Sequence, residues 1–234
     1  MVAMDNRAKS EWRWAALPVA ALLLLAVLPY VSRDWTTRER NEHHFDRIFR
    51  GLEGTSLFSL QPNAYMIRTL EGRTPGRALD VAMGQGRNAL WLASKGWDVT
   101  GFDISQAGLD AALASAKNLG VPLHTMRESV DDFDYGRERW DVVLLIYAPV
   151  RYESKELMKR IHDSLKPGGL VIVEDEIEWS RSRTDPRPPG SLAPGELRAA
   201  FTDGYQILDL HEVQAVSEWF PRLTLLGRLT AQRQ

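Results

Sequence analysis

The sequence predicts an α/β protein: a doubly wound, mostly parallel seven-stranded sheet with one antiparallel edge strand, preceded by an N-terminal hydrophobic anchor helix. Three observations lead to this prediction. Short apolar runs alternate with helical segments from residue 77 onward, the last two runs have no helix between them, and residues 14–31 carry no charged side chain. Strict alternation is typical of parallel strands joined by helical crossovers, whereas two consecutive strands indicate a hairpin.

The composition supports a globular chain and excludes some classes of function. Of the 234 residues, 44% are hydrophobic, which is enough for a packed core. Lys and Arg total 29 against 31 Asp and Glu, and the resulting net charge of −2 argues against a dedicated nucleic-acid-binding protein. The chain has no cysteine, which excludes disulfides, thiolate metal ligands and a cysteine nucleophile.

Residues 1–35 are expected to form a membrane anchor with its flanks. Trp14–Val31 is an uncharged run of 18 residues, and a helix of that length spans about 27 Å, just enough for a hydrocarbon core. Monotopic insertion is the main alternative, because Pro18 and Pro29 shorten the unbroken helix; a signal peptide and a buried helix are weaker ones. Arginines are more frequent after the run than before it, so a single pass with the following domain on the cytoplasmic side is expected.

The remaining chain divides into a linker helix over residues 36–54 and a domain over residues 55–234. A short helix is expected to begin at Gln61-Pro62-Asn63 and to reach about Leu70, with the proline in its first turn. Strands and helices then alternate, and a Pro-, Arg- and Gly-rich loop over residues 181–195 interrupts the pattern before the closing hairpin. The expected strands are residues 78–82, 98–102, 123–127, 141–146, 170–174, 205–213 and 223–231, and the helices between them are residues 87–95, 105–119, 154–165 and 196–201.

A glycine turn, Gly84-x-Gly86, follows the first strand and opens a helix. Glycines at this point allow a bound cofactor to approach the backbone and the free N–H groups of the helix start. Asp103 ends the next strand, 19 residues after Gly84, where a carboxylate can accept hydrogen bonds from ribose hydroxyls. The same spacing fits a dinucleotide site, with Ala89 at the third glycine position, or an ordinary tight turn in which Asp103 caps a helix.

Asp80 argues against a dinucleotide cofactor. A dinucleotide site normally has only apolar residues in this buried strand, because the pyrophosphate is repelled by a nearby anion. An acid four residues before Gly84 suits a cofactor with a positively charged end, and S-adenosylmethionine carries an ammonium and a sulfonium.

The run from Ala78 to Asn88 (ALDVAMGQGRN), followed by GWDVTGFD over residues 96–103, resembles the class I S-adenosylmethionine-dependent methyltransferases, most closely the small bacterial tellurite-resistance-type branch. The resemblance covers about residues 55–232. It implies that S-adenosylmethionine is the cofactor and that the turn and its neighbours bind it. The implied cofactor-binding residues are Asp80, Met83, Gly84, Gly86, Asn88, Asp103, Ile104, Ser129 and Val130, with Ile104, Ser129 and Val130 near the adenine.

The acceptor is expected beyond the ends of the fourth and fifth strands. Tyr147 follows the fourth strand and is the candidate catalytic residue, although a tyrosine that merely covers the sheet end is equally compatible. Acids at 174–176 and Glu178 follow the fifth strand, where solvated loop acids are the commoner outcome. Three arginines of the Pro-rich loop are candidates for a lid: Arg181, Arg183 and Arg187.

The function expected from these features is methyl transfer by in-line displacement from S-adenosylmethionine to a small, possibly lipophilic acceptor, on a domain tethered to a membrane through residues 14–31. Neither a metal nor a nucleic-acid partner is expected. Two alternatives remain open: a nicotinamide-dependent oxidoreductase, which Asp80 disfavours, and a non-catalytic nucleoside-binding membrane scaffold.

Overall fold

The computed structural model of this protein describes residues 37–52, 59–177, 191–219 and 221–234. The chain divides into two compact units, Met1–Arg40 and Asn41–Gln234, and the second holds the sheet. The predicted membrane segment at 14–31 and the arginines of the 181–195 loop before residue 191 lie outside the described residues. Within the described ranges, the structure contains no helix that is both long and apolar enough to span a membrane.

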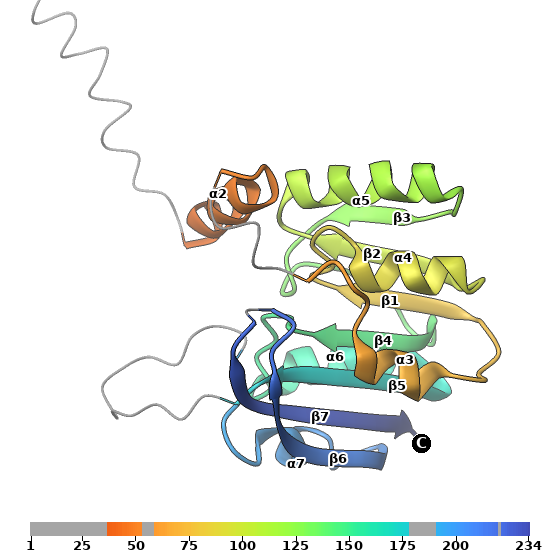
Figure 1. The fold of residues 1–234 in the computed structure, drawn as a ribbon. Helices are drawn as coiled ribbons and strands as arrows, with labels where there is room; N and C mark the ends of the chain where they lie inside the picture. The colour runs from red at the N-terminus through yellow and green to blue at the C-terminus, as the bar shows by residue number, and fades with distance from the viewer. Residues whose placement is uncertain (1–36, 53–58, 178–190, 220) are drawn as a thin grey trace, which may run out of the picture. The chain divides into compact units, whose positions relative to one another are not determined.

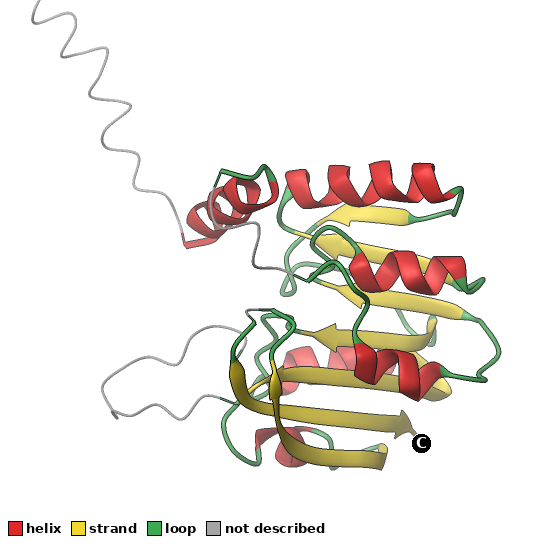
Figure 2. Ribbon diagram, viewed as in Figure 1, coloured by secondary structure: helices red, strands yellow, loops and turns green. Residues whose placement is uncertain are grey.

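A seven-stranded mixed sheet forms the centre of the second unit, as Figures 1 and 2 show. Its strand order is β3-β2-β1-β4-β5-β7-β6. Strands β1 to β5 are parallel, and β7 pairs antiparallel with both β5 and β6. The strands are β1 Arg77–Val81, β2 Asp98–Asp103, β3 His124–Arg127, β4 Trp140–Ile146, β5 Leu165–Glu176, β6 Tyr205–Val216 and β7 Leu223–Arg233.

Helices cover both faces of the sheet, and each face has its own hydrophobic core (Figure 1). One core contains Met66, Leu92 and Leu109 from three different helices, and the other contains Ile161 and Leu197 from the opposite face. The helices are α2 Thr37–Phe49, α3 Ala64–Leu70, α4 Arg87–Ser94, α5 Gln106–Leu119, α6 Lys155–Ser164 and α7 Glu196–Ala200.

Local sequence signals explain where several helices begin. Asn63, Ser105 and Ser154 precede α3, α5 and α6, and each side chain accepts a hydrogen bond from a backbone N–H in the first helical turn. Such caps satisfy donors that have no partner inside the helix. Gly86 precedes α4 with a φ of 80°, a conformation that favours glycine.

The predicted α/β class, the seven strands and the helical segments between them are confirmed, with two corrections. The antiparallel strand is not at the edge: β7 lies one place inside it, because the closing hairpin inserts its second strand between β5 and β6. Pro62 precedes the capping residue Asn63 and so lies before α3 rather than in its first turn. Residues Asn41–Phe49 of α2 belong to the same compact unit as the sheet.

Candidate functional site

The carboxyl ends of four neighbouring strands, β2, β1, β4 and β5, meet at one edge of the sheet, where parallel α/β sheets bind their ligands. Two non-glycine residues at this edge have a positive φ. Ala82 follows β1 with a φ of 54°, and Tyr147 follows β4 with a φ of 52°. Such backbone conformations cost free energy and cluster at functional sites. Of the three described non-glycine residues with positive φ, two therefore lie at this edge, and the third, Glu138, precedes β4 at the opposite edge.

Asp103 and the glycine turn are directly joined. The backbone N–H of Gly84 donates to Asp103 Oδ2 at 2.8 Å, and that of Ser105 donates to Oδ1 at 2.8 Å. Burial raises the pKa of the Asp103 carboxyl, and the Asp46 carboxylate raises it further, while the backbone donors oppose the shift. Each carboxylate oxygen can accept more than one hydrogen bond, so a rigidly oriented acceptor for hydroxyl groups lies beside the turn.

Asp80 lies beneath the same turn, almost completely buried. Its Oδ2 accepts a hydrogen bond from the N–H of Ala89 in the first turn of α4, at 3.0 Å. Burial raises the pKa of Asp80 to about 7, against the opposing effects of that hydrogen bond and of the Arg87 charge. A carboxyl group that is close to half ionised at neutral pH is sensitive to any charge brought near it.

Asn88 and Met83 take structural positions in this arrangement. The Asn88 Oδ1 accepts a hydrogen bond from the backbone N–H of Asn63, at 2.9 Å, and so ties α4 to the cap of α3. The side chain of Met83 packs in the core against Gly101, where a Cβ atom would lie 2.1 Å from its sulfur.

The three residues expected near an adenine all lie next to the end of β2. Ile104 follows Asp103 directly and its carbonyl accepts a hydrogen bond from Arg127 Nε. The strand end is joined to the next loop by a bond from Glu128 N–H to the Asp103 carbonyl, at 3.2 Å. The Ser129 hydroxyl donates to Asp132 Oδ2 within its own turn, and Val130 is buried.

Residues Asn41–Phe49 of α2 belong to the same compact unit as the sheet and cover the glycine turn. The sequence did not indicate this contact. A Cβ atom added to Gly84 would lie 2.9 Å from the Phe49 ring, and one added to Gly108 would lie 3.1 Å from it. Asp46 Oδ1 accepts hydrogen bonds from the Ser105 hydroxyl at 2.5 Å and from Ala107 N–H at 3.1 Å. Through these contacts, residues Asn41–Phe49 of α2 form one wall of the site.

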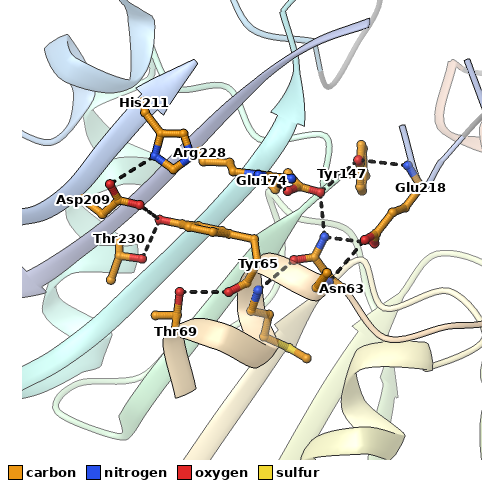
Figure 3. Close-up of polar contacts among 12 residues, drawn as sticks. Asn63, Tyr65, Thr69, Tyr147, Glu174, Asp209, His211, Glu218, Arg228 and Thr230 are labelled. Atoms are coloured by element: carbon orange, nitrogen blue, oxygen red, sulfur yellow. Dashed lines mark hydrogen bonds and ion pairs between the residues drawn. The ribbon is translucent and has the colours of Figure 1, made fainter. Parts of the chain in front are cut away.

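A second group of polar side chains occupies the ends of β4 and β5 (Figure 3). At its centre is Glu174, whose side chain is fully buried. Its Oε1 accepts hydrogen bonds from Asn63 Nδ2 at 2.6 Å and from the Tyr147 hydroxyl at 3.0 Å, and its Oε2 pairs with Arg228 Nε at 2.6 Å. A buried carboxylate needs such compensation, because an isolated buried charge is strongly unfavourable.

Glu218, in the turn between β6 and β7, joins three elements to this group. Its carboxylate accepts hydrogen bonds from Arg87 Nη1 at 2.7 Å and from Asn63 Nδ2 at 3.0 Å. Its backbone N–H donates to the Tyr147 hydroxyl at 3.2 Å. No local motif marks Glu218 in the sequence, because its partners are more than 70 residues away.

The hydroxyl of Tyr147 is therefore engaged on both sides, as a donor to Glu174 and as an acceptor from Glu218. Burial raises the pKa of Tyr147 above its ordinary value, and the neighbouring Glu174 carboxylate adds to the shift. The phenol stays protonated at neutral pH, so Tyr147 is unsuited to act as a general base.

The acids after β5 differ from the solvated loop residues that composition favours. Glu174, Asp175 and Glu176 are all at least nine-tenths buried. Glu176 forms an ion pair with Arg222. Glu178 lies outside the described residues. These carboxylates are structural members of the strand, because β5 extends to Glu176 between two neighbouring strands.

Residues 78–169 match a family described as a methyltransferase domain. Over 96 residues the chain is 29% identical to a ubiquinone biosynthesis O-methyltransferase of Rickettsia conorii, an alignment that covers 41% of this chain and spans a third (33%) of the relative's length. The resemblance to class I methyltransferases predicted from the sequence is thereby confirmed for the region that carries the glycine turn.

Solved structures agree on the fold. TehB from Haemophilus influenzae has a TM-score of 0.63 and 16% identity, and the match covers 81% of this chain and 67% of that one. A 1,6-didemethyltoxoflavin-N1-methyltransferase from Burkholderia thailandensis has a TM-score of 0.59 and 18% identity, with 99% and 93% of the two chains covered. That enzyme was solved with 1,6-didemethyltoxoflavin and S-adenosylhomocysteine bound.

Proposed function

We propose that this chain, whose residues 78–169 match a family described as a methyltransferase domain, transfers a methyl group from S-adenosylmethionine to a small lipophilic acceptor. The observation that carries the proposal is the arrangement of Asp103, Gly84 and Asp80 at one edge of the sheet. The Asp103 carboxylate, which can accept hydrogen bonds from hydroxyl groups, lies beside the glycine turn, and the buried Asp80 carboxylate lies beneath it.

The residues present fit this cofactor. The glycines at 84 and 108 keep the backbone of the turn and of α5 close to Phe49, because a side chain on either would meet that ring. Asp103, oriented by two backbone N–H groups, would accept the ribose hydroxyls. Asp80 would lie toward the ammonium of the amino-acid end, where a positive charge favours its ionised form.

Bound S-adenosylmethionine supplies both the reactive methyl group and the leaving group. The chain then has to hold the acceptor in line and to exclude water. Tyr147, held through its hydroxyl by Glu174 and Glu218, would position the acceptor rather than take its proton. A lipophilic acceptor agrees with the name of the Rickettsia relative, a ubiquinone biosynthesis O-methyltransferase, and with the apolar run at residues 14–31.

We also propose that residues 14–31 anchor the chain in a membrane, with the domain on the cytoplasmic side, and that nucleic acid is not the substrate. The support is the length of the uncharged run, the distribution of arginines around it and the net charge of −2. Resistance of the full chain to alkaline extraction from membranes, and its loss on deletion of residues 14–31, tests the anchor. Release of the full chain by alkali would contradict it.

Calorimetric titration of the full chain with S-adenosylmethionine and, separately, with NADH tests the cofactor. We expect micromolar binding of S-adenosylmethionine and no binding of NADH. Binding of NADH alone would identify an oxidoreductase, and binding of neither would identify a scaffold. Mass spectrometry of a lysate incubated with a deuterated methyl donor then identifies the labelled acceptor.

A further inference from the structure

Aromatic rings line the acceptor side of the site. The rings of Tyr147 and Trp219 lie nearly parallel, at an interplanar angle of 17° and with centroids 6.3 Å apart. Phe45 of α2 lies 6.3 Å from Trp219 on a tilted plane, and Phe49 stacks against Phe45 at 6.4 Å. The series begins at the end of β4 and ends at Phe49, which contacts Gly84 in the glycine turn.

Hydrogen bonds hold the side chain of Tyr147 and the backbone of Trp219 in place. The Tyr147 hydroxyl is bonded to Glu174 and Glu218, so the residue presents its ring rather than its hydroxyl. Trp219 follows Glu218 in the β6–β7 turn, and its backbone N–H donates to the Ser217 hydroxyl at 3.1 Å. Fixed rings lose little conformational entropy when a ligand binds, which favours their use in recognition.

The charges next to the rings are balanced. The guanidinium carbon of Arg87 lies 5.8 Å from the centre of the Tyr147 ring, and Arg87 pairs with Glu218 at 2.7 Å. Arg228 pairs with the fully buried Glu174 at 2.6 Å. A surface of aromatic faces with paired charges suits a ligand that is flat and uncharged better than a phosphate-bearing one.

We propose, resting on the function proposed above, that the acceptor is an uncharged aromatic ring compound and that Trp219 determines this specificity by stacking on it. Stacking on an aromatic face adds about 2- to 12-fold to affinity beyond the burial of area. Tyr147 acts with Trp219 as a positioning residue. This assigns the β6–β7 turn, outside the matched family region, to acceptor recognition.

The test compares two ligands with the same ring skeleton and hydroxyl position, one flat and aromatic and the other saturated and puckered. The full chain, saturated with S-adenosylhomocysteine, is titrated with 2-naphthol and with its saturated counterpart 2-decahydronaphthol. We expect 2-naphthol to bind about 5- to 10-fold more tightly. Trp219→Leu keeps an apolar side chain without a flat face, and should abolish this preference while leaving the affinity for S-adenosylhomocysteine unchanged.

The matched control is Trp91→Leu, in α4, where the tryptophan lies beside Lys95 and not in the aromatic series. It should leave the preference intact. Equal affinities of the two ligands, or a preference that survives Trp219→Leu, would overturn the inference. So would methylation of 16S ribosomal RNA in place of the aromatic compound when tritiated S-adenosylmethionine is supplied. Failure of the wild type to bind S-adenosylhomocysteine would instead count against the proposed function.

Discussion

Asp103→Asn tests the cofactor site with the smallest change in shape. The substitution removes the negative charge and replaces one acceptor oxygen with an NH2 group. The NH2 group cannot accept one of the two hydrogen bonds that the carboxylate now accepts from Gly84 and Ser105, and it cannot accept a hydrogen bond from a ribose hydroxyl in the complex. Hydrogen bonds to charged groups contribute about 1.5–3 kcal/mol each. We expect S-adenosylmethionine binding to weaken by about 1–3 kcal/mol, or about 5- to 150-fold in Kd.

Isothermal titration calorimetry of the full chain measures this change. Asp98→Asn is the matched control, because it makes the same substitution at the other end of β2, where the side chain is exposed. Urea denaturation of both variants separates a loss of binding from a loss of folding, since Asp103 also satisfies two backbone donors. A folded Asp103→Asn variant whose Kd lies within twofold of the wild type would refute the reasoning.

Three further predictions concern the residues around this centre. The pKa of Asp80 is about 7, and a cationic ligand favours its ionised form. S-adenosylmethionine should therefore bind less tightly at pH 6 than at pH 7.5, and Asp80→Asn should remove most of this pH dependence. The same pH dependence in the variant would show that another group titrates. Glu174→Ala leaves the partly buried Arg228 without its carboxylate partner and should lower the free energy of unfolding by about 3 kcal/mol in a urea titration. The control Glu212→Ala removes an exposed carboxylate of β6 and should not lower it. Equal losses in the two variants would contradict the importance of the ion pair. Gly84→Ala places a side chain on a residue with a φ of 53° and against the Phe49 ring, so it should destabilise the fold by about 1 kcal/mol or more. Adding Phe49→Ala removes the steric contact and should restore part of that stability. No recovery in the double variant would show that the whole cost arises from the backbone conformation.

The sequence predicted those parts of the fold that local patterns encode. Helices were predicted to start at residues 105 and 154, and in the structure Ser105 and Ser154 cap α5 and α6. The alternation of strands and helices predicted the parallel half of the sheet. The position of β7 inside the edge was not predictable, because a hairpin can add to β5 through either of its strands. Long-range packing, and not the residues of the turn, determines which strand of the hairpin pairs with β5.

The candidate site divides in the same way. Gly84 and Asp103 belong to a compact motif, and the structure joins them by a direct hydrogen bond. Phe49 and Glu218 come from segments far away in the chain and carry no local signal, so only the fold shows that they reach the same edge. Asp175 and Glu176 were expected in solvent, because composition does not show that β5 continues through them.

The most direct test of the central claim is a crystal structure of the full chain with S-adenosylhomocysteine. We predict that the nucleoside lies along the glycine turn and that both ribose hydroxyls donate to the Asp103 carboxylate at about 2.7 Å. A nucleoside bound at another edge of the sheet, or a carboxylate of Asp103 directed away from the sugar, would contradict the account.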